Sequence, residues 1–215
     1  GFGLGARTGI DVPSEKGGTL PSREWKRSRF SRREDQVWYP GETLITGIGQ
    51  GYLQTTPLQL AHATAIVAAR GQRFRPMLIT GVRDTVTSED VMFEPEALPP
   101  VRLIDENLWQ EVIDTMVAVV HGPTGTARRI GEGAPYTIAG KTGTAQVISI
   151  AQDAEYDEQE LEERQKDHAL FVAFAPAEAP RIAVAVIVEN GGSGSGVAAP
   201  VARAVLDSYL LGSGQ

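Results

Sequence analysis

Residues 181–188 (Arg-Ile-Ala-Val-Ala-Val-Ile-Val) are the feature that most limits how this chain can fold. The run is apolar on both faces of an extended strand, a pattern typical of a central strand covered by helices. A second strand candidate precedes it at residues 168–174, and a helical pattern follows at residues 200–211. With a strand around residues 136–148, these segments predict an α+β fold in which helices flank an antiparallel sheet.

Helix start and stop signals surround residues 56–71. Thr56 is a capping residue, Pro57 suits the first helical position, and Gln59 completes a capping box. We therefore expect a helix that runs to Arg70 and is ended by Gly71.

A second helix is expected from about Asp105, because apolar residues recur there at helical spacing and give the helix a broad apolar face. The residues of that face are Leu108, Trp109, Val112, Ile113, Met116, Val117 and Val120. Residues 1–51 are dense in Gly and Pro and predict long loops with short strands. Residues 76–103 predict hairpin-like strands and turns, and residues 191–196 predict a Gly/Ser loop.

The composition excludes several classes of protein. A net charge of −7 and a pI near 5.1 argue against nucleic acid as a partner. The absence of cysteine removes disulfides and thiolate metal sites and is compatible with an oxidising compartment. We find no signal peptide and no run of 18 apolar residues. A Gly-rich start without Met suggests a piece of a longer polypeptide.

The segment Lys141-Thr-Gly-Thr144 places a cation, two hydroxyls and a bare backbone position on one strand. Alternation puts Thr142 and Thr144 on one face and Lys141 and Gly143 on the other. All four can serve one pocket only if the strand lies at a sheet edge that borders a cleft. The ammonium and hydroxyls suit a carboxylate, Gly143 allows a close backbone approach, and an extended peptide could add to the edge as a strand.

The nucleophile that belongs with this motif is not found in the chain. Lys-Thr-Gly is a signature of penicillin-binding proteins and class A β-lactamases, whose nucleophile is the serine of Ser-x-x-Lys. No serine here has a lysine three residues later. Ser88-Glu-Asp90 matches the letters of the second signature, but it sits in a turn-rich stretch too close to Lys141, and we treat it as a coincidence. We therefore expect the substrate-binding half of an acyl-transfer site.

Beyond this motif, the chain resembles the class B penicillin-binding proteins, and in particular the elongation-type D,D-transpeptidases of the penicillin-binding protein 2 group. The matching segments follow the family's order along nearly the whole chain. They are Arg7-Thr-Gly-Ile-Asp-Val-Pro13, Leu20-Pro-Ser-Arg-Glu-Trp-Lys26, Gly47-Ile-Gly-Gln-Gly-Tyr52, Thr56-Pro-Leu-Gln-Leu60, Gly125-Thr-Ala127, Lys141-Thr-Gly-Thr-Ala-Gln146 and Val188-Glu-Asn-Gly-Gly192.

The resemblance implies an enzyme that cross-links peptidoglycan stem peptides through an acyl-enzyme and is acylated by β-lactam antibiotics. It implies catalytic roles for Lys141, in the proton network of the serine, and for Thr144, whose N–H would be one of two oxyanion donors. Thr142, Gly143, Thr144, Ala145 and Gln146 would bind substrate, with the two threonine hydroxyls on the donor carboxylate. No cofactor and no metal are expected in this chain.

The resemblance also implies where the parent protein works and what the chain lacks. The serine, the second signature, the metal-ligand cluster of some members and the membrane anchor would lie upstream. The parent would act at the periplasmic face of the bacterial inner membrane, with a membrane glycosyltransferase and elongation proteins as partners. Residues 1–215 would then be the C-terminal portion of one transpeptidase domain, with a loop and helical part at 1–135 and the sheet part at 136–215.

An incomplete domain has a structural consequence. The family's five-stranded sheet takes two strands from before the nucleophile, so residues 181–188 should have an unpaired edge in this chain. An apolar strand exposed in this way invites aggregation. We therefore expect the chain to be stable only beside its missing N-terminal half.

Three alternatives stay open. Gly47-Ile-Gly-Gln-Gly51 follows Leu44-Ile45 and precedes a helix, although its spacing is not that of a dinucleotide-binding loop. A β-lactamase-type serine hydrolase shares the Lys-Thr-Gly signature. A non-catalytic fragment or partner-binding module is the third alternative.

Two charged segments and the histidines are not explained by the motif. Residues 23–33 carry six bases and one acid. This run could contact membrane phospholipid or an acidic partner, or it could be a solvated loop anchored by Trp25 and Phe30. Residues 153–167 hold eight acids and two bases. This segment could form a lid, a partner site or a solvated loop. We expect the scattered histidines, His62, His121 and His168, to be structural.

Overall fold

The computed structural model describes residues 1–145 and 166–212. The chain forms two compact units, one made of Gly1–Gln59 and Phe74–Pro99 and the other of Leu60–Arg73 and Pro100–Gln215. The division expected at residue 135 stays a prediction. None of the described helices is both long and apolar enough to cross a membrane.

The second unit contains a three-stranded antiparallel sheet of β5 (Ala139–Ala145), β6 (His168–Ala175) and β7 (Ile182–Val188). The three strands predicted from the sequence are confirmed. Their order is β5-β6-β7, so β6 is central among the described residues. Among the strands that the structure describes, the apolar strand β7 is therefore an outer one, as expected for an incomplete sheet.

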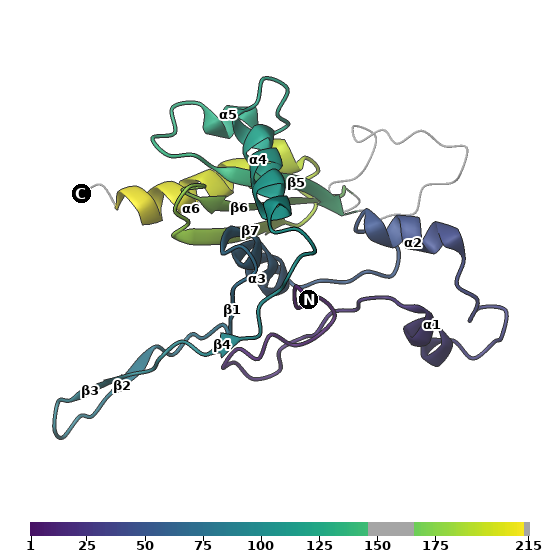
Figure 1. Ribbon diagram of the computed structural model, residues 1–215, viewed down its shortest axis with the longest axis horizontal. Coiled ribbons are helices and arrows are strands. Elements are labelled where there is room, and N and C mark those ends of the chain that lie inside the picture. Colours follow the sequence, from purple (N-terminus) through teal and green to yellow (C-terminus); the bar gives the residue numbers. More distant parts are fainter. Residues whose placement is uncertain (146–165, 213–215) are drawn as a thin grey trace. The chain divides into compact units, whose positions relative to one another are not determined.

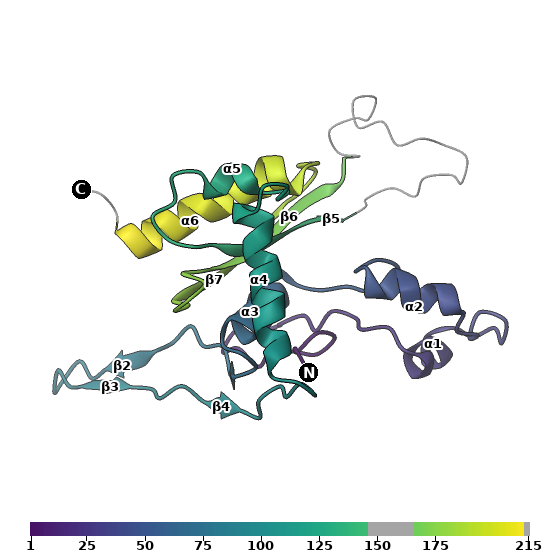
Figure 2. The same cartoon turned by 45° about the horizontal axis from the view of Figure 1, so that its top comes forward.

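Helices cover both faces of this sheet. Side chains alternate along β6, so Phe171 lies in one apolar cluster and Phe174 in another, and both are fully buried. The cluster of Phe171 includes residues of α5 (Arg128–Gly131) and α6 (Ala199–Leu211). The cluster of Phe174 includes Ile113 of α4 (Asn107–His121), which crosses the opposite face (Figures 1 and 2). The predicted α+β fold is confirmed.

The apolar face of α4 is narrower than predicted. The side chains that α4 buries are Trp109, Ile113 and Val120. Leu108 and Val112 are 40% and 44% exposed. Met116 and Val117 are half-buried against the cluster of Phe174, so Leu108 and Val112 are the residues of the predicted face that stay exposed.

The capping box of α3 (Pro57–Ala68) is confirmed. The Gln59 side chain accepts the Thr56 N–H at 3.0 Å, and the Gln59 N–H donates to Thr56 Oγ1 at 3.1 Å. The helix ends at Ala68, two residues before the predicted end. Arg70 has a φ of 50° and Gly71 a φ of 91°, and neither angle is helical.

The first unit contains helices where short strands were predicted. These are α1 (Arg23–Arg29) and α2 (Pro40–Gly47), so the short strands predicted for residues 1–51 are wrong, while the long loops predicted there are confirmed. The Ser22 hydroxyl caps α1 by accepting the Trp25 N–H at 3.0 Å. The predicted hairpin is confirmed as β2 (Gly81–Arg83) and β3 (Asp90–Met92). A short pair, β1 (Arg73–Phe74) and β4 (Ala97–Leu98), completes the described strands.

The segment between β7 and α6 is more regular than the predicted Gly/Ser loop. It contains one π-helical turn, η2 (Gly194–Ala198), which continues directly into α6. The Ser193 hydroxyl caps this turn by accepting the Gly196 N–H at 3.1 Å. The π-helical turn packs against the sheet next to the Lys-Thr-Gly strand.

Candidate functional site

The Lys-Thr-Gly segment lies on β5, which is an outer strand of the sheet, as the motif required. In the described part of the chain β5 pairs with β6 alone, so its other edge is unpaired. Ala139 belongs to the apolar cluster of α4, so strand alternation places Lys141 and Gly143 on the face toward α4. Thr142 and Thr144 lie on the opposite face. An unpaired edge with this pattern can accept an extended peptide as an added strand.

The charged and hydroxyl groups of β5 differ in their surroundings. Lys141 and Thr144 are exposed, while Thr142, Gly143 and Ala145 are half-buried. The Lys141 ammonium donates to the Thr142 carbonyl at 2.7 Å and forms no ion pair with any described residue. An exposed ammonium at a strand edge can interact with an anionic or proton-transferring group.

A second hydroxyl segment meets β5 after α4. Thr126 Oγ1 lies 3.2 Å from Thr142 Oγ1. The approach depends on Gly125, where a Cβ would lie 2.4 Å from the Val119 carbonyl oxygen. The Ala127 N–H donates to that carbonyl at 3.0 Å and fixes the turn. Thr126 is thus a site residue that the sequence analysis did not select, although Gly125-Thr-Ala127 was among the matching segments.

The π-helical turn supports the centre of β5. A Cβ on Gly194 would lie 2.4 Å from the Gly143 carbonyl oxygen and 2.5 Å from the Leu170 carbonyl oxygen. Only glycine allows this approach of η2 to the backbones of two strands. A Cβ on Gly143 would lie 3.3 Å from the Leu170 Cβ, which is a tight contact.

The loop after β7 braces the end of the β5–β6 pair. His168, opposite Ala145, accepts the Asn190 N–H on Nδ1 at 3.0 Å. The Gly192 N–H donates to the Asp167 carbonyl at 2.8 Å. His168 is therefore structural, as expected.

A polar network holds the segment that leads into β5. The Tyr136 hydroxyl donates to Asp207 Oδ1 at 2.5 Å, and Arg203 Nε donates to both Asp207 oxygens at 2.8 Å. Burial and the bond to Asp207 raise the pKa of Tyr136 to about 12. Burial alone would raise the pKa of Asp207, but the bonds from Tyr136 and Arg203 outweigh it and lower that pKa.

His121, at the end of α4, is a second anchor for this segment. Its Nε2 accepts the Ile138 N–H at 2.9 Å. Burial lowers the pKa of His121, which favours the neutral form that this acceptor needs. His121 is therefore structural as well.

The structure brings together most of the residues selected from the sequence. Lys141, Thr142, Gly143, Thr144 and Ala145 all lie on β5. Gln146 lies outside the described residues, as does nearly all of the acidic segment 153–167.

The rival motifs do not form sites of their own. Leu44 and Ile45 belong to the helix α2, which ends at Gly47, so Gly49 and Gly51 follow a helix and not the strand that a dinucleotide-binding loop needs. Ser88 lies in the turn of the β2–β3 hairpin with a φ of 60°.

The fold and the edge strand are those expected of a transpeptidase domain of the penicillin-binding protein class. Residues 1–207 match the family model of the penicillin binding protein transpeptidase domain, and the chain belongs to this family.

Within the family the chain is similar to the penicillin-binding protein 2 group, as its motifs predicted. It is 46% identical over 211 residues to the peptidoglycan D,D-transpeptidase MrdA of Acinetobacter baumannii, covering 98% of this chain and 30% of the relative. The crystal structure of Pseudomonas aeruginosa PBP2 in complex with WCK 5153 superposes with a TM-score of 0.79 at 48% identity, covering 98% of this chain and 42% of that one.

A third structure is similar at lower identity. It is the complex between PBP2 and MreC from Helicobacter pylori, whose matching chain has a TM-score of 0.76 at 30% identity, with coverage of 98% of this chain and 34% of that chain. The chain thus spans less than half the length of the relatives that it matches.

Proposed function

We propose that this chain forms the substrate-binding half of a serine-type peptidoglycan D,D-transpeptidase, which cross-links stem peptides during cell elongation. The observation that carries the proposal is the unpaired edge of β5, which presents Lys141-Thr-Gly-Thr144. The activity belongs to the parent polypeptide, because the nucleophilic serine is supplied from outside residues 1–215.

In this proposal the stem peptide extends along the β5 edge, and main-chain hydrogen bonds give it affinity. The hydroxyls of Thr142 and Thr144 bind the donor carboxylate, and Thr126 supports Thr142 through the contact between their hydroxyls at 3.2 Å. The exposed ammonium of Lys141 takes part in the proton network of the serine. A β-lactam occupies the same edge through its own carboxylate.

The reaction runs through two acyl transfers. The serine oxygen bonds to the donor carbonyl carbon, the amide bond to the leaving residue breaks, and the serine proton passes to the departing amine. An acceptor amine then attacks the ester carbonyl carbon, the bond to the serine oxygen breaks, and a proton from the amine returns to the serine. The Thr144 N–H and the N–H of the serine form the oxyanion hole, where one donor is worth on the order of 3 kcal/mol of transition-state stabilisation.

The relatives support a setting for the parent protein. The curated relative from A. baumannii is a peptidoglycan D,D-transpeptidase, and PBP2 of H. pylori has been solved with MreC. We therefore place the parent at the periplasmic face of the inner membrane. Its partners would be an MreC-like elongation protein and a membrane glycosyltransferase.

The test is the rate at which a fluorescent penicillin acylates the parent protein and its Lys141→Ala variant. We expect the variant to react about a hundredfold more slowly, because a positioned proton-transfer group typically contributes at least that factor to the rate. Lys16→Ala, which removes an exposed lysine outside β5, is the matched control and should react at the parent rate. Equal rates for all three proteins would contradict the proposal. A penicillin ester that persists for hours distinguishes a transpeptidase from a β-lactamase.

A further inference from the structure

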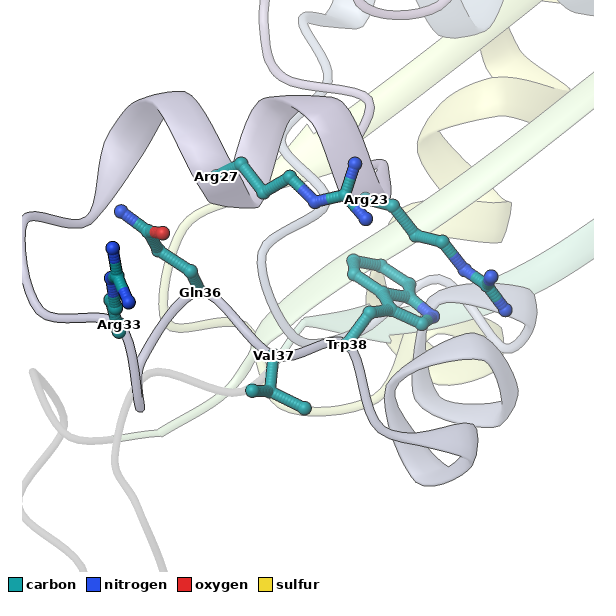
Figure 3. A pocket seen from close by; sticks show the side chains of 6 residues that line it. All are labelled: Arg23, Arg27, Arg33, Gln36, Val37 and Trp38. Atoms are coloured by element: carbon teal, nitrogen blue, oxygen red, sulfur yellow. The ribbon is translucent and has the colours of Figure 1, made fainter.

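A basic hollow in the first unit is not used by the proposed acyl transfer. Its volume is about 500 Å³, and it lies between α1 and the loop that follows this helix (Figure 3). The residues that line it are Arg23, Arg27, Arg33, Gln36, Val37 and Trp38. Figure 3 shows Arg23 and Arg27 leaving α1 on one wall, with Arg33, Gln36, Val37 and Trp38 on the other.

A buried lysine joins these two walls. Lys26 of α1 is 5% exposed, and its ammonium donates to the Val37 carbonyl at 2.7 Å. The same ammonium pairs with Glu42 Oε1 at 2.5 Å and lies 5.4 Å from the centre of the Tyr39 ring. Its charge is thus neutralised within the fold, and it holds the wall of α1 against the wall of the loop.

Side-chain hydrogen bonds also fix the loop wall. Gln36 Nε2 donates to the Phe30 carbonyl at 2.8 Å. Trp38 Nε1 donates to Thr43 Oγ1 at 2.8 Å. The hollow is therefore built by the fold, because both walls are held by defined contacts.

The charges of the three arginines in the hollow exceed those of the described acids that act on them. Within the described part of the chain, Arg23, Arg27 and Arg33 form no salt bridge, whereas the neighbouring Arg32 approaches Glu34 at 3.9 Å. Glu24, the one acid among residues 23–33, accepts hydrogen bonds from its own backbone N–H and from Ser22, and the charges of Arg27 and Arg23 also help to lower its pKa. Three positive groups thus gather in one hollow of a chain whose net charge is −7.

We propose that this hollow binds a phosphate group, carried by a small soluble molecule or by a lipid head group. Guanidinium groups bind the oxygens of phosphate through paired hydrogen bonds. A phosphate group can carry more negative charge than a carboxylate, so it matches three guanidinium groups better. The hollow shape favours a discrete group over a flat contact, and the Trp38 ring offers an apolar wall to the part of the ligand next to the phosphate.

The experiment uses the full polypeptide that contains this chain, at low ionic strength. Inorganic diphosphate is titrated by calorimetry, and binding to phosphatidylglycerol vesicles is measured by sedimentation against phosphatidylcholine vesicles. Arg27→Gln should weaken the binding about tenfold, the loss expected for one charged hydrogen-bonding partner. Arg27→Lys, which keeps the charge but loses the planar fork, should weaken it less.

Arg32→Gln is the matched control, because it removes the same charge from the same basic run but outside the hollow. It should change the affinity less than twofold. If diphosphate binds and is weakened by Arg27→Gln but not by Arg32→Gln, the proposal is supported and the ligand is a soluble molecule. If only the vesicles bind, with the same effects of the two variants, the proposal is supported and the phosphate belongs to a lipid head group. The proposal is overturned if Arg32→Gln weakens binding as much as Arg27→Gln, if neither probe binds, or if polyglutamate binds the hollow more tightly than diphosphate. Unchanged melting of each variant shows that the fold is intact.

Discussion

Gly194 is the position where one methyl group should do most damage to the candidate site. In Gly194→Ala the new Cβ would lie 2.4 Å from the Gly143 carbonyl oxygen and 2.5 Å from that of Leu170. Ordinary contacts begin near 3.4 Å. The π-helical turn must therefore move away from β5 and β6 by about 1 Å, because both obstacles are backbone atoms of the sheet.

Overpacking of this kind costs about 1–3 kcal/mol, and the rigid neighbours place Gly194→Ala at the upper end, about 2–3 kcal/mol. Each kcal/mol lowers the Tm of a 150–250-residue protein by about 2–4 °C and that of a larger one by less, so we expect the Tm of the parent protein to fall by at most roughly 4–12 °C. Penicillin acylation of the parent protein should also slow, because Gly143 belongs to the Lys-Thr-Gly segment.

The assay is thermal unfolding followed by circular dichroism, together with the acylation rate. Gly196→Ala is the control in the same turn, since its Cβ would meet only the Ser193 side chain, at 3.2 Å from Oγ. It should cost less than about 1 kcal/mol. If Gly194→Ala melts and reacts like Gly196→Ala, then η2 does not support β5 and the reasoning fails.

Three further predictions concern hydrogen-bonded polar side chains. Gln59 is 1% exposed and donates to the Ala6 and Gly17 carbonyls at 2.7 Å, so Gln59→Leu should lower the free energy of unfolding by about 3 kcal/mol in urea titrations. The pKa of Tyr136 rises from 10 to about 12 on folding, so stability is full below pH 10 and falls as the pH rises to 12. Tyr136→Phe should therefore lose less stability than the parent between pH 9 and pH 11, as measured by thermal melts. An equal loss in the two proteins would refute this prediction. The pKa of His121 is lowered on folding, so its contribution is present above about pH 6.5 and is lost as the pH falls further. His121→Leu should cost about 1 kcal/mol at pH 7 and flatten this acid dependence.

The sequence predicted the sheet and its edge strand because both are recorded in local patterns. The alternating and apolar runs of β6 and β7 identify strands wherever they pack. The Thr56–Gln59 capping box likewise specifies a helix start through bonds between residues three apart. These features depend on near neighbours in the chain.

The missed features depend on contacts or were obscured by composition. The many Gly and Pro residues before position 51 hid two helix starts, although Pro40 followed by Glu42 was a usable signal, since Glu42 accepts the Tyr39 N–H at 2.8 Å. The contact of Thr126 with Thr142 joins residues 16 apart and depends on the backbone turn at Gly125. Spacing along the chain could not reveal it.

The most direct test of the central claim is to locate the penicillin adduct in the parent protein by intact-mass spectrometry and peptide mapping. We expect one adduct, on a serine outside residues 1–215, formed far more slowly in Lys141→Ala. An adduct on any residue of this chain would contradict the claim that β5 is the binding wall of a site whose nucleophile comes from elsewhere.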